Sequence, residues 1–216
     1  MARRKELKKA EYRALSNCFS REDQMAGRWH HFFENDHPIT FELGCGKAEF
    51  SLQLARKYPQ RNFVGVDLKM DRMWYAAKAA LEEGLSNLAF IHLNLIEIDQ
   101  FVAENEAAEI WITFPDPFPK KRQAKHRMIN PPFLKKYQRI LQTGHYLNFK
   151  TDNRELFHYG LEVFVRQDNI RFHQLTFDLH EDERFDEDVK FLTTYERDFM
   201  AMGKPTHFVQ LEFLST

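Results

Sequence analysis

Two clusters of residues carry groups that can hold a ligand, and the first is the segment ELGCGK at 42–47. Gly44 and Gly46 suit a turn between a strand and a helix, because a residue without a Cβ adopts positive φ easily and lets a ligand approach the backbone. Asp67 follows ~20 residues later, where a carboxylate in nucleotide sites accepts hydrogen bonds from both ribose hydroxyls. The spacing predicts a cradle for a nucleoside-containing cofactor.

Other polar residues narrow the identity of that cofactor. A nicotinamide dinucleotide site favours a third glycine near position 49, where this chain has Glu49, so an NAD-dependent dehydrogenase is disfavoured. Glu42 adds a carboxylate that attracts a sulfonium or an ammonium and repels a pyrophosphate. Asn94, at the end of a later apolar segment, offers its amide to an adenine edge. Each residue taken singly also fits a plain turn or cap, but together they predict S-adenosylmethionine.

The second cluster is FPDPFPKKRQAKHR at 114–127, which follows an apolar segment directly. Its three prolines restrict the backbone around Asp116 and Phe118, so both side chains are held in place before a ligand binds. Phe118 suits stacking on a nucleobase, and five cations suit phosphates: Lys120, Lys121, Arg122, Lys125 and Arg127. The alternative for such a run is a solvated charged loop. Its position at the end of a strand favours a base pocket with a phosphate clamp.

Seven short apolar segments are predicted strands, separated by segments with helical periodicity. The strands are 39–43, 62–67, 88–94, 109–114, 145–150, 170–178 and 206–213. Helices are expected after the first two strands, from Pro131 to about Gln142, and after Asp152. This alternation predicts an α/β, Rossmann-like fold with three layers, α/β/α, and a mostly parallel seven-stranded sheet. Ligands of such sheets bind at the carboxyl ends of the strands, so we expect both clusters at one edge.

Length and composition indicate a single domain. The chain has 216 residues, 43% of them hydrophobic, which is enough for a substantial core. We assign residues 38–216 to this domain and residues 1–37 to a basic N-terminal arm that is not a separate domain. The net charge of -1 conceals local segregation: residues 1–13 carry six basic and two acidic side chains, whereas residues 178–188 carry seven acidic and one basic. The acidic run is expected to be a mobile, solvated loop rather than a metal site.

The sequence also bears on location and metal content. No apolar run approaches the ~18 residues that a membrane span requires, and the basic start leads into no apolar signal-peptide core. Cys18 and Cys45 are too few for a disulfide framework and lack metal-ligand spacing. We therefore expect a cytoplasmic protein without a membrane association or a bound metal.

The two clusters resemble those of a known family, the bacterial tRNA (guanine-N7-)-methyltransferases, in which a strand ends in FPDPWPKKRHxKRR. The resemblance extends through ELGCGK, FKTDNRELF at 149–157 and LTTYERDFMAMGKP at 192–205, in the family's order and spacing. It covers nearly everything from about residue 39 onward. It implies a class I methyltransferase fold for residues 38–216. It also implies methyl transfer from S-adenosylmethionine to N7 of a guanine in the variable loop of tRNA, at position 46 in tRNA numbering.

The resemblance also implies roles for individual residues. It places four residues at the family's S-adenosylmethionine positions: Glu42, Asp67, Asn94 and Asp116. It places others at the substrate positions: Lys120, Asp152 and Thr193 to Glu196. The segment from Arg122 through Lys125 to Arg127 matches the RNA-contacting segment. The chain departs from the family in having Phe118 where tryptophan is common, Asp67 where glutamate is common and Ala48 where glycine is common.

The expected chemistry needs no general base, because guanine N7 bears a lone pair and no proton. It requires in-line placement of nucleophile, methyl group and sulfur. Asp116 is the expected catalytic residue, since a carboxylate there stabilises the positive charge that moves onto the purine and orients the base. Asp152 and Glu196 are candidates to share that task.

Local patterns offer structural readings for two substrate positions. Asp152 suits a helix N-cap, and Thr193 with Glu196 fits a Thr-x-x-Glu capping box. A capped helix start at the cavity is compatible with substrate binding. No obligate protein partner is evident, and we expect a monomer or a homodimer.

Two other functions remain open from the sequence. DPFP resembles the motif with which N6-adenine methyltransferases grip an exocyclic amine, although Phe118 stands where that motif has a second proline. A non-catalytic RNA-binding module that kept a nucleotide cradle is the other alternative. Cofactor binding and the identity of the methylated base discriminate between these functions.

Overall fold

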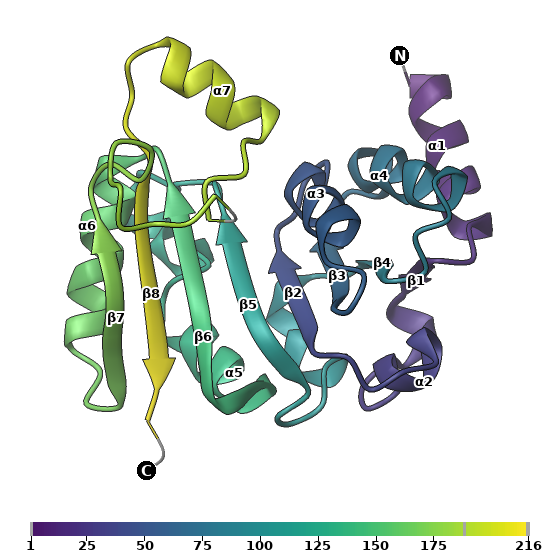
Figure 1. The fold of residues 1–216 in the computed structure, drawn as a ribbon, viewed down its shortest axis with the longest axis horizontal. Coiled ribbons are helices and arrows are strands. Elements are labelled where there is room, and N and C mark those ends of the chain that lie inside the picture. The colour runs from purple at the N-terminus through teal and green to yellow at the C-terminus, as the bar shows by residue number, and fades with distance from the viewer. Residues whose placement is uncertain (1, 188, 215–216) are drawn as a thin grey trace.

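The computed structural model describes residues 2–187 and 189–214 and is built around one sheet with helices on both faces (Figure 1). The strands of this sheet lie in the spatial order β1 (Cys18–Ser20), β4 (Leu88–His92), β3 (Asn62–Asp67), β2 (Ile39–Leu43), β5 (Ala107–Thr113), β6 (Leu141–Thr151), β8 (His207–Phe213) and β7 (Ile170–Thr176). Every neighbouring pair from β1 to β6 is parallel, and β8 runs antiparallel to both of its neighbours. The predicted three-layer, mostly parallel architecture is confirmed.

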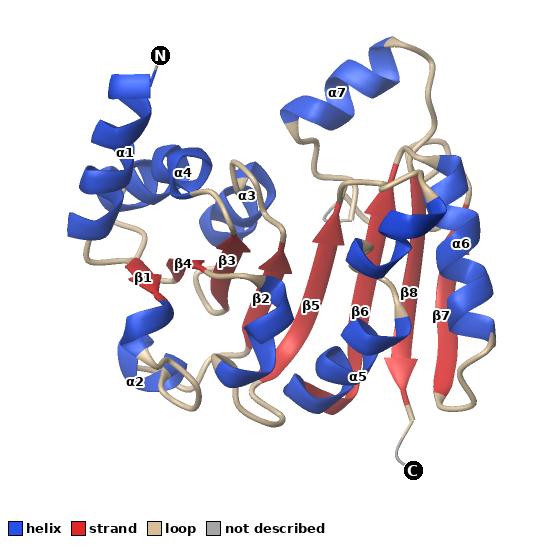
Figure 2. Ribbon diagram, turned by 180° about the vertical axis from the view of Figure 1, so that it is seen from behind, coloured by secondary structure: helices blue, strands red, loops and turns tan. Residues whose placement is uncertain are grey.

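Helices cover both faces of the sheet and complete two apolar cores. One face carries α1 (Ala2–Ala14), α3 (Glu49–Lys57) and α4 (Met70–Glu82), and the other, seen in Figure 2, carries α2 (Trp29–Phe33), α5 (Pro131–Ile140) and α6 (Arg154–Val165). The last helix, α7 (Thr194–Ala201), stands beyond the carboxyl ends of the parallel strands (Figure 1). Because helices pack on both faces, all five residues of β2 are buried.

Local sequence explains where two of these helices begin. Asn130 accepts a hydrogen bond from the backbone N–H of Phe133 and so caps α5, whose first residue is Pro131. Asn153 caps α6 in the same way, through the N–H of Leu156. The predicted N-cap at Asp152 is therefore wrong by one residue, which leaves the Asp152 carboxylate available for another role.

The strand count predicted from the sequence is wrong, since the sheet has eight strands among the described residues rather than seven. The additional strand is β1, which pairs with β4 from Cys18 opposite Phe90. Three residues are too short to show an alternating pattern, so only the tertiary pairing reveals this strand. Its neighbours Tyr12 and Trp29 are buried in the two cores, and residues 2–37 therefore pack onto the sheet.

Helix α5 is also shorter than predicted, ending at Ile140 rather than near Gln142. Leu141 is buried and opens β6 by pairing with Ala107, so the sheet recruits residues that helical periodicity assigns to α5. The parallel register aligns the carboxyl ends of β2, β3, β5 and β6 at one edge. No helix in the part of the chain that the structure describes is long and apolar enough to cross a membrane.

Candidate functional site

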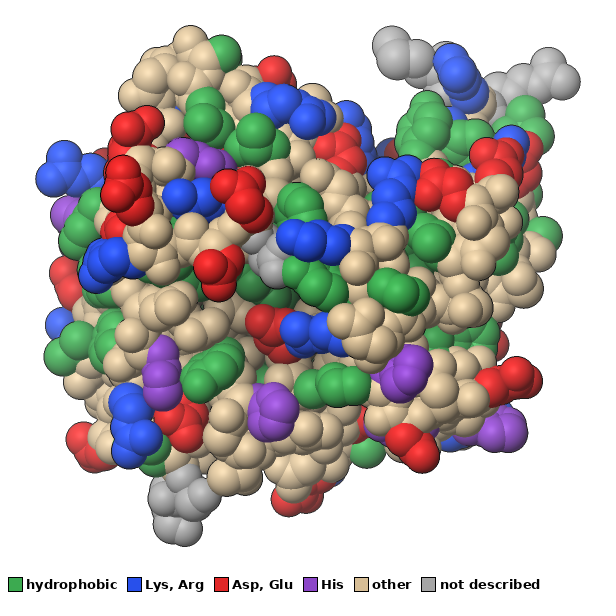
Figure 3. All heavy atoms as spheres, viewed as in Figure 1, with side chains coloured by type: hydrophobic (Ala, Val, Ile, Leu, Met, Phe, Trp, Pro, Cys, Tyr) green, Lys and Arg blue, Asp and Glu red, His purple; other side chains and the backbone are tan. Residues whose placement is uncertain are grey.

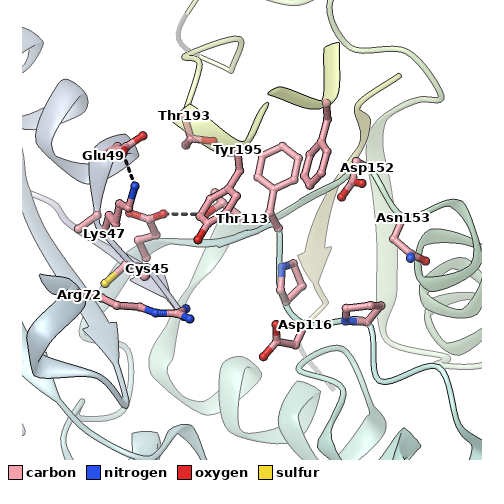
Figure 4. A pocket seen from close by; sticks show the side chains of 18 of the residues that line it. Cys45, Lys47, Glu49, Arg72, Thr113, Asp116, Asp152, Asn153, Thr193 and Tyr195 are labelled. Carbon is pink, nitrogen blue, oxygen red and sulfur yellow. Dashed lines mark hydrogen bonds and ion pairs between the residues drawn. The ribbon is translucent and has the colours of Figure 1, made fainter. Parts of the chain in front are cut away.

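A cavity of about 380 Å³ opens at this edge of the sheet, between α3 and α7 (Figure 4). Five parts of the chain line it: the end of β2 with the following turn, Arg72 in the first turn of α4, the end of β5 with the proline-rich loop, the loop after β6, and α7 with its flanks. Six residues predicted as site residues line it together: Glu42, Gly44, Gly46, Asp116, Asp152 and Thr193. Both clusters from the sequence therefore meet in one cavity.

The glycine turn after β2 is held by its own backbone and by Asp67. Gly44 and Gly46 adopt positive φ values of 73° and 57°, and a Cβ built on Gly46 meets no atom within 4 Å. The Asp67 carboxylate accepts hydrogen bonds from the N–H groups of Gly46 at 2.9 Å and Lys69 at 2.8 Å. Asp67 does not line the cavity, but it fixes the turn that does. A carboxylate has about four lone-pair positions, so capacity remains for a ligand.

Glu42 is the buried acid of the cavity and retains 2% of its exposed surface. Its carboxylate accepts hydrogen bonds from the Thr113 hydroxyl at 2.6 Å and from the Ser51 hydroxyl and N–H group. Burial raises the pKa of Glu42, and the hydrogen bonds from Ser51 and Thr113 oppose that rise. The structure thus fixes a carboxylate in the cavity wall.

Asp116 is exposed in a loop whose backbone is tightly constrained. Phe114 and Phe118, on either side of it, adopt left-handed φ values of 48° and 44°, which cost a residue with a Cβ roughly 1–2 kcal/mol each. The N–H of Phe114 donates to the carbonyl of Lys150 at 2.8 Å, which joins the loop to β6. In Figure 4 the Asp116 carboxylate and the Arg72 guanidinium approach the cavity from opposite sides.

Arg127 supports this loop through contacts with its backbone. Its guanidinium donates hydrogen bonds to the carbonyls of Pro117 at 3.2 Å and Phe118 at 3.1 Å, and it lies 4.2 Å from the ring centroid of Tyr159. The structure therefore places Arg127 in contact with the chain's own backbone rather than beside the cavity. Lys120, Arg122 and Lys125 are exposed on or next to the short 3-10 helix Lys121–His126, outside the cavity.

Helix α7 roofs the cavity and is fastened to the glycine turn. Glu49 accepts hydrogen bonds from the N–H group of Thr194 at 2.5 Å and from its hydroxyl at 2.8 Å. On the other side, the Lys204 ammonium lies 3.6 Å from the Asp152 carboxylate. Dinucleotide-binding sites have a third glycine at the position of Glu49. In this chain the side chain at that position holds the roof of the cavity.

A buried ionic cluster lies beneath the start of α7. Lys150 and Glu196 have no exposed side-chain surface and form an ion pair at 2.9 Å, while His180 lies 2.8 Å from the same carboxylate. The Lys150 ammonium also donates to the carbonyls of Val189 at 3.2 Å and Phe191 at 3.1 Å. Burial lowers the pKa of Lys150, and the negative charge of Glu196 opposes that change.

Glu196 and Asn94 are two further predicted site residues that lie outside the cavity. The expected capping box is confirmed, since Glu196 and Thr193 bond reciprocally, but the structure does not bring Glu196 to the cavity. Asn94 is exposed and caps the 3-10 helix Leu95–Gln100 by accepting from the N–H of Ile96. Asn94 follows β4 and lies, like Asp67 at the end of β3, at the carboxyl edge of the sheet. It does not line the cavity.

Sequence reasoning missed several residues that line the cavity. They are Lys47, Arg72, Thr113, Phe199 and Lys204, whereas Tyr195 falls within the segment Thr193 to Glu196 that the resemblance implied. Thr113 ends a predicted strand and could have been found from that position alone. Lys47 ends the predicted ELGCGK segment, whereas Arg72 lies on α4, Phe199 on α7 and Lys204 after α7, and only the fold brings these three to this edge.

Comparisons with known proteins agree with the geometry. A family model described as "Putative methyltransferase" matches residues 36–209. The tRNA (guanine-N(7)-)-methyltransferase of Cytophaga hutchinsonii is 36% identical over 99% of both chains, and that of Christiangramia forsetii is 40% identical over 88% of this chain and 85% of its own. The 16S rRNA (adenine(1408)-N(1))-methyltransferase from Catenulisporales acidiphilia has a similar fold, with a TM-score of 0.62 at 15% identity over 88% of this chain and 93% of its own.

The matched family model defines the chain as a methyltransferase, and its sheet, with an antiparallel β8, carries a glycine turn and an acid at the carboxyl edge. The relatives share sequence over nearly the whole chain, well beyond the glycine turn. The chain belongs to the tRNA (guanine-N(7)-)-methyltransferase family. The predicted family is thereby confirmed.

Replacing Lys150 by Met is expected to destabilise the protein, because it leaves the buried Glu196 carboxylate with His180 as its remaining ionic contact. Removing one partner of a buried ion pair costs about 3–5 kcal/mol, so Tm is expected to fall by roughly 10 °C in a thermal melt. The double variant Lys150→Met/Glu196→Gln buries no unpaired charge and is expected to recover part of the loss. A single variant that melts within about 2 °C of wild type contradicts the assigned role.

Glu42→Gln is expected to separate stability from cofactor binding. Because the folded-state pKa of Glu42 lies above 4.5, the carboxyl stabilises the fold at pH below 4.5, and this contribution is lost as pH rises through the raised pKa. Glutamine lacks that loss, so the Tm of the variant relative to wild type is expected to rise between pH 5 and pH 8. Its affinity for S-adenosylmethionine, measured by calorimetry, is expected to fall at least tenfold, about 1.4 kcal/mol.

The exposed Glu104 provides a matched control for this variant. Glu104→Gln removes the same charge at a distance from the cavity and is expected to change neither quantity. Wild-type cofactor affinity in Glu42→Gln refutes a role for this carboxylate in binding.

Proposed function

We propose that this chain transfers the methyl group of S-adenosylmethionine to N7 of a guanine in tRNA, in the variable loop at position 46 of the tRNA numbering. The observation that carries the proposal is the position of Asp116. It stands exposed at the cavity on a loop that contains three prolines, and the glycine turn and Glu42 line the same cavity. The relatives named tRNA (guanine-N(7)-)-methyltransferase support the choice of base and substrate.

The residues present suit the proposed cofactor. Gly46 leaves open space where a side chain would stand, and the buried carboxylate of Glu42 offers negative charge to a cationic ligand. Asp67 retains lone pairs for ribose hydroxyls beside the same turn. When bound, the cofactor supplies an electrophilic methyl group on a sulfonium. The chain binds and orients it through these groups.

Asp116 is proposed to hold and polarise the guanine. Its carboxylate can accept hydrogen bonds from the N1 and N2 hydrogens of the base, which fixes the direction of N7. Positive charge accumulates on the purine during transfer, and a preoriented carboxylate stabilises it without reorganisation at the moment of reaction. The prolines and the Arg127 contacts restrict the loop before substrate arrives.

No residue is assigned to proton abstraction, because N7 has no proton to lose. The aromatic rings of Phe114 and Phe199, whose centroids lie 6.2 Å apart, help to exclude water from the cavity. Lys120, Arg122 and Lys125 are proposed to contact phosphates at its entrance, since they are exposed and directly follow the loop that carries Asp116. Asp152 and Thr193, which line the cavity, are proposed to contact the substrate nucleotide.

We place this activity in the cytoplasm, with residues 38–216 as the methyltransferase domain and no obligate protein partner. The free thiols of Cys18 and Cys45 suit a reducing compartment. A monomer or a homodimer is sufficient, because one chain contributes all of the residues invoked above.

Methylation of unmodified tRNA tests the proposal directly. Purified protein is incubated with the RNA and methyl-labelled S-adenosylmethionine, and the labelled nucleoside is identified by nuclease digestion and chromatography. Label is expected in 7-methylguanosine and at the variable loop. Label on adenine N6 would establish the alternative suggested by the DPFP motif, and absence of label despite tRNA binding would identify a non-catalytic module.

Asp116→Asn is expected to lower kcat by about 10²-fold, the order found when one preoriented electrostatic contact to a transition state is removed. Its affinity for tRNA, measured by filter binding, is expected to stay within about twofold of wild type, because the phosphate contacts are intact. Asp168→Asn, at an exposed site on the loop before β7, is the matched control and is expected to be fully active. Unchanged turnover in Asp116→Asn would remove Asp116 from the chemistry.

A further inference from the structure

A second, smaller cavity of about 200 Å³ lies between α1 and the segment that follows β3. Four cations line it, three from α1 and one from the residue before α4: Lys5, Lys9, Arg13 and Lys69. We call these four residues the α1 cation surface. The family resemblance and the proposed chemistry assign no role to it.

The α1 cation surface adjoins the main cavity through the first turn of α4. Met70 and Asp71 line the smaller cavity, and the next residue, Arg72, lines the main one. The smaller cavity also touches Leu68, just after β3, and His92, the last residue of β4, so both cavities open at the same edge of the sheet. In Figure 3 this edge is hollowed between the parts formed by α7 and α1, and Lys and Arg side chains are visible on both sides of the hollow.

Helix α1 is fixed in place rather than loosely attached. Tyr12 retains 1% of its exposed surface and packs in the core formed with α3 and α4. The Lys8 ammonium lies 3.7 Å from the ring centroid of Tyr75 and 5.0 Å from that of Trp74, both on α4. A ligand at this surface therefore meets a helix whose backbone is already in place, and no ordering of that backbone is needed on binding.

Positive charge on this surface exceeds its local compensation. From Arg4 to Ala14 the helix carries five basic and two acidic side chains. Asp71 is the one acid that lines the smaller cavity, and it lies 3.7 Å from Lys5, whose side chain remains 51% exposed. Arg13 and Lys69 have no ion-pair partner among residues 2–187 and 189–214 (ion pairs within 4.0 Å).

We propose that the α1 cation surface binds backbone phosphates of the same RNA whose guanine enters the main cavity. The inference rests on the proposed function for the identity of that RNA. Lys5, Arg13 and Lys69 are exposed, whereas Lys9 pairs with Glu6 at 2.8 Å and keeps 31% of its side-chain surface exposed. Phosphate is the ligand that matches such a surface, and a polyanion is the ligand that can also reach the neighbouring cavity. The surface lies on the β4 and β1 side of the cavity, whereas Lys120 to Lys125 follow β5, so the RNA is held from two directions.

The test measures tRNA binding by Lys9→Gln/Arg13→Gln across a range of salt concentrations. Each lost phosphate contact lowers the slope of log K against log salt concentration by about one, so the double variant is expected to lose about two. Its Kd at 0.15 M salt is expected to rise by about tenfold or more. Circular dichroism and S-adenosylmethionine affinity, both expected to match wild type, show that the fold and the main cavity are intact.

Two control variants complete the design. Lys135→Gln/Arg139→Gln removes the same charge from α5 at the opposite edge of the sheet and is expected to bind tRNA like wild type. Lys9→Arg/Arg13→Lys keeps both charges and is expected to retain affinity and slope. If the charge-conserving variant also loses binding, packing of α1 rather than its charge is responsible, and the proposal fails.

The outcomes separate this inference from the proposed function. If wild type forms 7-methylguanosine in tRNA while Lys9→Gln/Arg13→Gln keeps the wild-type Kd and salt slope, the inference is wrong and the proposed function stands. If wild type methylates no guanine while the double variant still loses tRNA affinity, the surface is an RNA contact and the proposed function is wrong. Binding of α1 to phosphatidylglycerol vesicles with unchanged tRNA affinity would identify a membrane contact and overturn the inference.

Discussion

Lys150 carries a charge into the interior at the point where the sheet meets the roof of the cavity. Its ammonium binds the Glu196 carboxylate and the carbonyls of Val189 and Phe191, all of which belong to α7 or to the segment that leads into it. Its own carbonyl accepts from the N–H of Phe114 and thereby starts the loop that carries Asp116. One residue of β6 therefore fixes both the roof of the cavity and the proline-rich loop that carries Asp116. The desolvation of its charge is opposed by the ion pair with Glu196 and by the hydrogen bonds to the two carbonyls.

The architecture follows from hydrophobic patterning because most strands are buried on both faces. Six of the predicted strands have bounds within about three residues of those observed, and all of these except the edge strand β7 are largely buried. The exceptions have a common cause. The start of β6 at Leu141 and the three residues of β1 are strands because of their partners, Ala107 and Phe90, rather than because of a local pattern.

The site is predictable where a residue's role depends on its own strand end. Glu42, Gly44 and Asp116 fall at the ends of predicted strands, and all of them line the cavity. In the second half of the chain, the chemical type of a residue predicts its role in the site less well. Glu196 has the carboxylate expected of a base-binding residue but is enclosed with Lys150, and Arg127 has the cation expected of a phosphate contact but serves backbone carbonyls.

The family resemblance places Thr193 to Glu196 at substrate positions, but local patterns do not place α7, because its position depends on contacts between residues distant in the chain. Thr194 bonds to Glu49, and Lys204 lies against Asp152. Neither pair shows a local motif. Tyr195 and Phe199 reach the cavity only as a consequence of these contacts.

Glu49 belongs to two structures at once: it begins α3 directly after the glycine turn, and its carboxylate holds the first residue of α7. A ligand that tightens the glycine turn therefore also favours one position of the roof. By thermodynamic linkage, a ligand that presses on the roof alters affinity at the turn by the same factor. The Glu49 carboxylate is thus the contact through which binding at the glycine turn and binding at the roof are expected to influence each other.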